Sequence, residues 1–328
     1  MKEVLTAVLI IVGALSAVVA AGLVALYFVV FYSPHKGQND DLQLPPGIDY
    51  SPYGELPVNM IKGAMREPFE TVEIVSEDGL RLRGRLYVRH PESAPLALGF
   101  HGYRGTPARD FSGGLISMLE AGFNVLLVEQ RAHGRSAGHT ITFGIKERRD
   151  CVRWAEYAAG RFGQAVPTVL FGISMGASTV LMASGEALPA NVRWIVADCP
   201  YNAPEEIIKS VIAKMKLPAG FFNFFVNLSA RIFGRFNLRE ITARDSVART
   251  GIPVTIIHGR EDGLVPCEMS AKIPGDNRNC ERFVFDNADH GLSYLEDKAR
   301  YERIVAEIFR RLGDQRTFCA GSFQGPVG

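Results

Sequence analysis

Near the middle of the chain, a serine between two glycines joins an apolar stretch to a run of small residues. Residues 168–171 read Thr-Val-Leu-Phe, Gly172-Ile-Ser174-Met-Gly176 follows, and residues 177–183 read Ala-Ser-Thr-Val-Leu-Met-Ala. This pattern predicts a strand that turns sharply into a helix, with glycines where side chains would crowd the turn. Serine at the turn would project its hydroxyl above the sheet, where the helix N-terminus favours developing negative charge.

Short apolar runs alternate with helix-compatible stretches over much of the chain. The apolar runs are Leu96–Phe100, Val125–Val128, Thr168–Phe171, Trp194–Ala197, Val254–Ile257 and Phe283–Phe285, and the helical stretches lie near 112–121, 146–162, 175–187 and 266–273. Continuous apolar runs are typical of strands buried on both faces, and their alternation with helices predicts a parallel sheet. Earlier, two alternating runs flank Asp78-Gly79 and predict an antiparallel hairpin. We therefore expect an α/β fold with a mostly parallel sheet of about eight strands and helices on both faces.

Residues 199–245 interrupt this alternation, because they contain no clear strand. Glu205–Lys216 and Ala219–Phe236 look helical, and the second stretch is rich in phenylalanine. An insertion of this size at the end of a strand predicts a helical lid over a site. We interpret its phenylalanines as lid core in preference to a membrane contact.

The N-terminus carries 29 residues without charge, from Val4 to Tyr32. A helix needs only about 20 apolar residues to cross a bilayer. A cleaved signal peptide is the alternative, with Val18-Val19-Ala20 as its cleavage site, but apolar residues continue for eleven positions beyond Ala20, to Phe31. We predict a single-pass anchor at 1–33, a Pro- and Gly-rich linker at 34–66, a catalytic domain at 67–312 and a disordered tail at 313–328.

The charges that flank this segment are nearly balanced. Lys2 precedes it, and His35 and Lys36 follow it. The positive-inside rule then leans slightly towards a catalytic domain on the outer face of the cell membrane. Five cysteines argue mildly for the other orientation.

Two further residues can activate Ser174, because a serine hydroxyl needs a base to become a good nucleophile. His290 directly follows the run Phe283–Phe285, and Asp262 follows the run Val254–Ile257. The chain order Ser, Asp, His is the order of one known catalytic triad, and all three would meet at the carboxyl edge of one sheet. Rival readings are an N-cap role for Ser174, an orienting role for Glu261, and His101, His133 or His258 as base.

A tetrahedral oxyanion would need two hydrogen-bond donors. The backbone N–H of Met175, directly after the nucleophile, is the first candidate. The second is the N–H of Tyr103, between Gly102 and Gly105, and the Tyr103 hydroxyl is an alternative.

Taken together, these motifs resemble the α/β-hydrolase superfamily, especially its bacterial membrane-anchored lipase- and esterase-like members. The matching elements lie within about residues 70–312 and are His101-Gly-Tyr, Glu129-Gln-Arg-Ala-His-Gly-Arg-Ser136, Gly172-Ile-Ser-Met-Gly176, His258-Gly-Arg-Glu-Asp262 and Asp289-His-Gly291. In the second element, Glu129 and Ala132 replace the Asp and Gly that the family often has. The resemblance implies hydrolysis of an ester, with no cofactor, by Ser174, His290 and Asp262.

Composition narrows the possible partners. The formal net charge is +1 and no Lys/Arg run stands out, so nothing favours nucleic acid. The cysteines form no C-x-x-C pair, and metal-cluster, Walker and dinucleotide motifs are absent. The anchor and the aromatic insertion favour a small-molecule or lipid ester as substrate. A peptidase, an acyltransferase and a catalytically silent membrane scaffold are the alternatives.

Overall fold

A computed structural model describes residues 1–34 and 42–321 and contains one eight-stranded sheet. The strand order is β1-β2-β4-β3-β5-β6-β7-β8. The strands are β1 (Glu70–Val75), β2 (Arg81–Tyr87), β3 (Leu96–Phe100), β4 (Asn124–Glu129), β5 (Thr168–Ile173), β6 (Val192–Asp198), β7 (Val254–Gly259) and β8 (Cys280–Phe285). Strand β2 is antiparallel to both of its neighbours, and all other pairs are parallel. The predicted hairpin and the mostly parallel sheet are confirmed.

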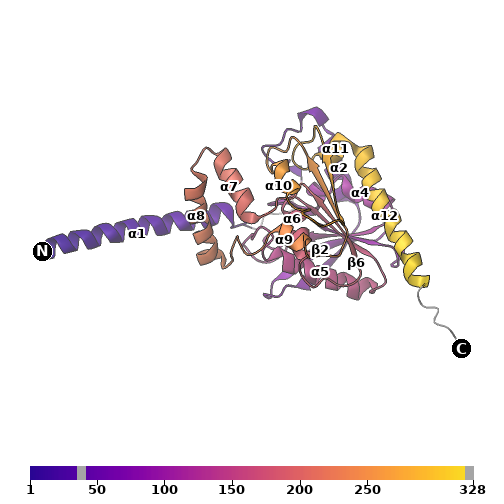
Figure 1. The fold of residues 1–328 in the computed structure, drawn as a ribbon, viewed down its shortest axis with the longest axis horizontal. Helices are drawn as coiled ribbons and strands as arrows, with labels where there is room; N and C mark the ends of the chain where they lie inside the picture. The colour runs from indigo at the N-terminus through magenta and orange to yellow at the C-terminus, as the bar shows by residue number, and fades with distance from the viewer. Residues whose placement is uncertain (35–41, 322–328) are drawn as a thin grey trace.

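Helices cover both faces of the sheet (Figure 1). Their bounds are α2 (Leu56–Arg66), α3 (Pro107–Asp110), α4 (Gly114–Glu120), α5 (Glu147–Phe162), α6 (Met175–Ala183), α9 (Ala243–Val247), α10 (Cys267–Ala271), α11 (Ser293–Glu296) and α12 (Lys298–Gly321). One buried cluster joins the sheet to α5, α6 and α9, and another joins it to α4 and α12. Successive strand residues alternate between them: Leu126 belongs to the first cluster and Leu127 to the second. This two-sided burial explains the continuous apolar runs.

The N-terminal helix α1 (Lys2–Val30) extends away from the domain over most of its length (Figure 1). Among the described residues it is the one helix that is long and apolar enough to cross a membrane. Its final turns lie against the domain, where Leu23 and Phe31 are buried. The Phe31 ring makes edge contacts with Phe143 and Phe236 at centroid distances of 6.0 and 5.2 Å. The apolar run therefore has an exposed part, up to Gly22, and a final part that packs on the domain.

The insertion at 199–245 is helical, as expected. It contains α7 (Pro204–Lys214), α8 (Ala219–Ser229), a π-helical turn at Ala230–Gly234, and α9. Helix α8 packs on α7 and on the end of α1, where the Ser229 hydroxyl donates to the Leu23 carbonyl over 2.9 Å.

Two segments differ from the expected organisation. Helix α2 and a short 3-10 turn at Ser51–Tyr53 form within the segment we expected to be a linker, and α2 buries Ile61 and Ala64. Helix α12 continues to Gly321, past Gly313 where we expected disorder to begin. The rest of the expected tail, 322–328, lies outside the described residues.

Candidate active site

Ser174 occupies the turn between β5 and α6. Its backbone is left-handed, with φ of 55°, which is strained for a residue other than glycine. A Cβ at Gly172 would collide with the backbone of Gly176, and one at Gly176 would collide with the Phe100 carbonyl. The two glycines are therefore what lets the turn close against β3. This close packing holds Ser174 in its strained conformation at the carboxyl edge of the sheet.

The structure brings Ser174, His290 and Asp262 into one hydrogen-bonded row. His290 Nε2 lies 2.9 Å from Ser174 Oγ, and His290 Nδ1 lies 2.7 Å from Asp262 Oδ2. The three side chains follow β5, β8 and β7. Ser174 and His290 are 116 residues apart in the sequence, and Asp262 and His290 are 28 apart. With Nδ1–H donating to the carboxylate, Nε2 is left to accept the serine proton.

Asp262 is held by three groups besides His290. Its Oδ1 accepts the backbone N–H groups of Leu264 and Val265, at 2.9 and 2.7 Å. Its Oδ2 lies 3.1 Å from Nε2 of the fully buried His258. Nearby, Asp289 Oδ1 accepts the N–H groups of both Gly263 and His290 at 2.7 Å, which ties the acid loop to the base loop. The sequence reading named His258 as a rival base and placed Asp289 only in the motif Asp289-His-Gly291, so it did not predict these contacts.

The charge of Asp262 sets the protonation of the neighbouring imidazole. Burial lowers the pKa of His290, but the Asp262 carboxylate outweighs burial and the pKa lies above its usual value. Burial likewise raises the pKa of Asp262, but His290 and His258 outweigh it, so this carboxyl stays ionised well below its usual range. This is the charge arrangement that stabilises an imidazolium formed during proton transfer.

The rival residues lie in other environments. His101 Nε2 accepts the Gln130 N–H and His133 Nε2 accepts the Arg104 N–H, so both rings brace loops. Burial lowers the pKa of His101 to about 3. Glu261 is exposed, whereas the neighbouring Asp262 is buried. Only His290 among the candidate bases contacts Ser174 in the part of the chain that the structure describes.

The two candidate oxyanion donors belong to Met175, which follows Ser174 in the sequence, and to Tyr103, which lines the same cavity as Ser174. Met175 is the first residue of α6 and is fully buried. The Tyr103 hydroxyl donates to the Val30 carbonyl at the end of α1 over 2.8 Å, and its ring stacks on Phe143. The hydroxyl is therefore engaged with the N-terminal helix, and of the two Tyr103 groups the backbone N–H is the candidate donor.

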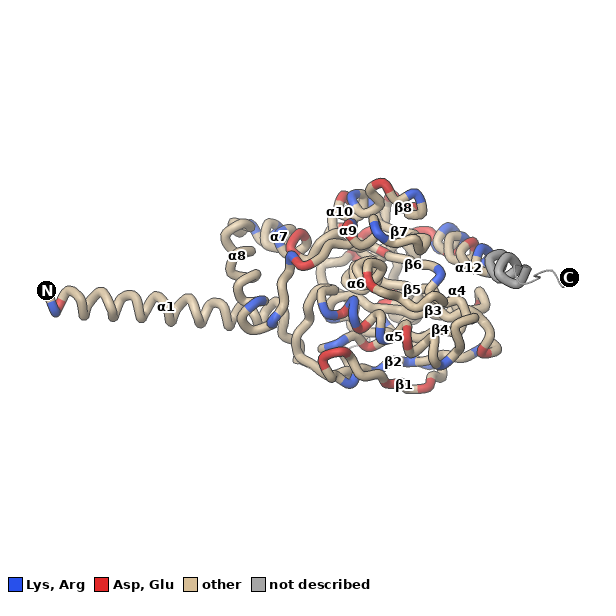
Figure 2. The backbone as a smooth tube through the Cα atoms, turned by 60° about the horizontal axis from the view of Figure 1, so that its bottom comes forward, with Lys and Arg blue, Asp and Glu red and all other residues tan. Residues whose placement is uncertain are grey.

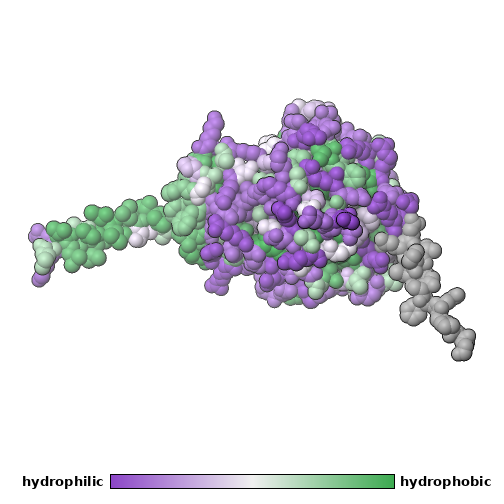
Figure 3. All heavy atoms as spheres, in the orientation of Figure 1, coloured by the Kyte–Doolittle hydropathy of each residue, from purple (hydrophilic) through white to green (hydrophobic). Residues whose placement is uncertain are grey.

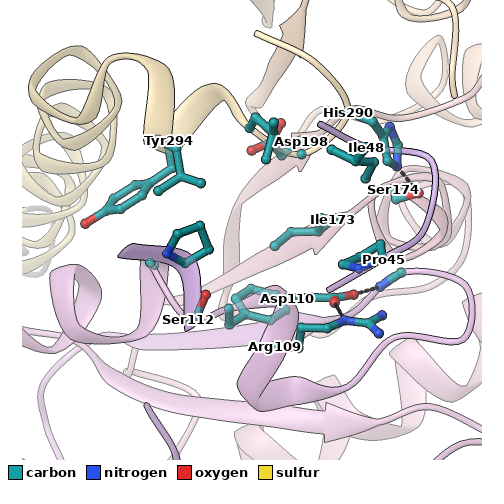
Figure 4. Close-up of a pocket in the computed structure, with 18 of the residues that line it drawn as sticks. Pro45, Ile48, Arg109, Asp110, Ser112, Ile173, Ser174, Asp198, His290 and Tyr294 are labelled. Carbon is teal, nitrogen blue, oxygen red and sulfur yellow. Dashed lines mark hydrogen bonds and ion pairs between the residues drawn. The ribbon is translucent and has the colours of Figure 1, made fainter. Parts of the chain in front are cut away.

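A cavity of about 160 Å³ opens beside Ser174 and His290 (Figure 4). Its walls are mainly apolar. Most of the lining comes from the loop after β3, the segment around α11 and residues 44–61, and the end of β5 completes it with Phe171 and Ile173. Leu44, Pro45, Ile48 and Tyr50 come from the segment that links α1 to α2, which we call the strap (residues 42–55). Pro45 and Ile48 lie next to Ser174 and His290 in Figure 4.

None of the described residues that line this cavity belongs to the insertion at 199–245. The strap thus occupies the position beside Ser174 that we expected the insertion to fill. The insertion packs on α1, and it also shares a buried apolar cluster with Met175 and Phe143. The difference arises because the strap contains apolar residues without helical or strand periodicity, so its sequence resembles a linker.

Asp198 is the buried acid of this cavity. Its Oδ2 accepts the Tyr301 hydroxyl over 3.0 Å, while Oδ1 has no protein partner among the described residues. Burial raises the pKa of Asp198 to about 6.

One cluster near the nucleophile has atoms that could ligate a metal. Potential ligand atoms of Cys199, Asp262 and His290 lie within 4.8 Å of one another, and all three residues are buried. Burial raises the pKa of the Cys199 thiol well above its usual value, which disfavours the thiolate that a metal needs. Asp262 and His290 already satisfy each other, so the donor set fits a proton-transfer row better than a metal centre.

Comparison with known proteins adds a family and several relatives. The family described as alpha/beta hydrolase fold matches residues 98–235. The uncharacterised protein YqkD of Bacillus subtilis is 24% identical over 198 residues, which are 60% of this chain and 65% of that protein. The matched stretch therefore covers slightly less than two thirds of this relative.

Solved structures with a similar fold include two esterases. An esterase from Pyrococcus furiosus aligns with a TM-score of 0.62 and 25% identity, covering 76% of this chain and 93% of that one. An esterase from Exiguobacterium antarcticum aligns with a TM-score of 0.56 and 16% identity, covering 74% and 100% of the two chains. The second likeness concerns the fold alone.

Proposed function

Since this chain belongs to the α/β-hydrolase superfamily, we propose that it is a serine hydrolase that cleaves a carboxylic ester. The observation that carries this proposal is the row Ser174 Oγ, His290 Nε2 and Nδ1, and Asp262 Oδ2, with spacings of 2.9 and 2.7 Å. The likeness of this chain to the Pyrococcus furiosus esterase supports an ester as the bond that is cleaved.

In the proposed mechanism, Ser174 Oγ attacks the ester carbonyl while His290 Nε2 takes the hydroxyl proton. The N–H groups of Met175 and Tyr103 stabilise the oxyanion of the tetrahedral intermediate. The intermediate then expels the alcohol, which leaves with the proton from His290, and an acyl-enzyme remains. Water attacks this ester as His290 takes its proton. The second intermediate collapses and releases the acid, while His290 returns the proton to Ser174 Oγ.

The proposed substrate is an ester with an apolar group, such as a lipid or lysolipid acyl ester. Leu44, Ile48 and Phe171 are among the apolar side chains in the cavity wall beside Ser174. A cavity of about 160 Å³ resembles in size the roughly 150 Å³ apolar cavity that admits benzene in another protein. Burial of an apolar acyl group here contributes about 25 cal/mol for each Å² removed from water.

We also propose that α1 anchors the enzyme in the cell membrane, with the catalytic domain on the outer face. The helix has 29 residues, and large apolar side chains such as Leu9, Ile10 and Val18 are at least 60% exposed. Water solvates such a surface poorly, whereas a bilayer covers it.

Fluorophosphonate labelling of the full-length protein in detergent tests for an activated serine. The native protein should become covalently labelled, and Ser174→Ala and His290→Ala should not. Glu261→Gln is the matched control, because its exposed carboxylate adjoins Asp262 but stays outside the row. It should label like the native protein. A folded native protein that stays unlabelled in both detergent and lipid vesicles would overturn the hydrolase proposal and favour a scaffold.

A further inference from the structure

We propose that residues 217–235, which we call the α8 segment, form a second membrane contact that lies in the interfacial layer of a phospholipid bilayer beside α1. This inference rests on the membrane anchoring proposed above. It replaces our interpretation of the phenylalanines as lid core. It also gives a role to the insertion, none of whose described residues lines the cavity.

The polarity of helix α8 is reversed relative to a helix on a water-soluble surface. Phe221 and Phe224 are each 61% exposed, whereas Asn223 and Asn227 are buried. Asn223 Nδ2 donates to Glu205 over 2.6 Å, and Asn227 Nδ2 donates to the Asn223 carbonyl. A surface helix normally places its apolar stripe inward and its polar residues outward. The exposed face of α8 therefore fits an apolar environment better than water.

The same apolar surface continues beyond α8. In the π-helical turn, Ile232 is 51% exposed and Phe233 is 40% exposed. Phe233 also contacts Tyr27 of α1, with ring centroids 5.9 Å apart. Figure 3 shows hydrophobic residues extending from α1 onto the part of the insertion that α1 meets. An apolar surface continuous with a membrane helix is most simply covered by the same bilayer.

The length of α1 places the α8 segment at the right depth. About 20 helical residues, at about 1.5 Å each, cross a hydrocarbon core of about 30 Å. Counted from Val4, that span ends close to Leu23, which is the first buried residue of α1 and accepts the Ser229 hydroxyl. The α8 segment thus meets α1 where the hydrocarbon core gives way to the headgroups.

The orientation and charge of the α8 segment agree with this depth. Figures 1 and 2 both show α8 crossing α1, as a helix lying in the membrane plane would. The stretch from Leu217 to Leu238 contains no Asp or Glu, and its exposed charges are Arg231 and Arg235. Apolar rings beside arginines are typical of interfacial helices, whose cations contact lipid phosphates.

The test measures whether the α8 segment contacts lipid while α1 holds the protein in place. Full-length Phe224→Trp is reconstituted into phosphatidylcholine vesicles, with or without bromine on the upper part of the acyl chains. Bromine quenches nearby tryptophan, and the native Trp154 and Trp194 are buried in the domain. Val75→Trp is the matched control, because Val75 is 53% exposed and belongs to the edge strand β1, which Figure 2 shows apart from α8.

We expect bromolipid to reduce the emission of the Phe224→Trp protein and to leave that of the Val75→Trp protein unchanged. If both proteins float with the vesicles but neither is quenched, the α8 contact is wrong while the anchor stands. Equal quenching of both variants also overturns the contact, because the signal would not be specific to α8. A protein that does not float with the vesicles overturns the anchoring itself. Fluorophosphonate labelling of the same samples reports separately on the hydrolase proposal.

Discussion

Asp262 is the residue on which the geometry of the candidate triad depends most. Both of its oxygens are occupied: Oδ1 by two backbone N–H groups, and Oδ2 by His258 and His290. A carboxylate fixed in this way cannot rotate away from the imidazole. It therefore holds His290 in the tautomer that presents a bare Nε2 to Ser174, and its charge keeps the pKa of His290 above the usual value.

We predict that Asp262→Asn changes both the rate and the pH dependence of ester hydrolysis. His290 must be neutral to accept a proton, so activity falls as the pH drops through its raised pKa. Asparagine removes the charge that raises this pKa, so the acidic limb of the profile should move to lower pH. The plateau rate should drop by on the order of 10³- to 10⁴-fold, because the favoured tautomer is lost. A pH profile of kcat/KM measures both effects.

The exposed neighbour provides the comparison for this prediction. Glu261→Gln should leave the limb and the plateau unchanged, since Glu261 does not contact His290 in the described structure. An Asp262→Asn protein whose acidic limb stays in place would show that Asp262 does not control the protonation of His290.

The three residues of the row could be predicted because each follows an apolar run that forms a strand of the sheet. Their partners could not be predicted in the same way. Asp289 reaches Gly263 across 26 residues, and His258 shares the Asp262 carboxylate with a histidine on another loop. Such contacts depend on how the loops after β7 and β8 lie side by side, which no local pattern in either loop encodes.

Among the elements, the strap is the one whose place at the site differs most from the sequence-based expectation. Its Leu44, Pro45, Ile48 and Tyr50 form one wall of the cavity beside Ser174. Prolines and glycines break any periodicity in this stretch, so its sequence is typical of a linker. The helices of the insertion were predictable from their own sequence. Their packing on α1 was not, because one apolar helix face fits a lid, a core or a bilayer equally well.

We predict that Ile48→Ala shifts the chain-length preference of the enzyme. Ile48 lines the cavity next to Ser174 (Figure 4), so the shorter side chain leaves room for additional substrate carbons. One methylene in an apolar pocket changes kcat/KM by about tenfold or more. We therefore expect the optimum in a series of p-nitrophenyl esters to move to longer acyl chains, with a relative gain on the order of tenfold.

Leu42→Ala is the matched control for the strap. Leu42 lies in the same segment but is 42% exposed and does not line the cavity. Its ester preference should match that of the native protein. If Ile48→Ala lowers kcat/KM equally for every ester, the strap supports the site without selecting the substrate.

For the whole molecule, the N-terminal apolar run divides into two parts that composition cannot separate. Up to Gly22 its side chains are exposed, whereas Leu23 and Phe31 are buried. Tyr103 and Arg104, in the loop beside the nucleophile, donate to the carbonyls of Val30 and Val29. The sequence reading placed one boundary at residue 33, because bilayer lipid and a protein core select the same apolar residues. The end of α1 is thus also part of the folded domain.

We predict that two N-terminal truncations differ in stability because of this division. Removal of residues 1–22 takes away only the exposed part of α1, so the melting temperature should stay close to that of the full chain in the same detergent. Removal of residues 1–33 also takes away Phe31, which is fully buried against Phe143 and Phe236. Loss of one buried phenylalanine costs about 3–5 kcal/mol, which lowers the melting temperature by roughly 10 °C in a domain of this size.

Phe31→Ala within the chain that lacks residues 1–22 separates packing from chain length. This variant should melt close to the chain that lacks residues 1–33, because both lose the same buried ring. Its fluorophosphonate labelling should also slow, since Tyr103 relies on the end of α1 for its position. Equal melting temperatures for the two truncated chains would mean that α1 serves only as an anchor. The observed burial of Leu23 and Phe31 argues for the opposite result, in which membrane attachment and the nucleophile loop share one helix end.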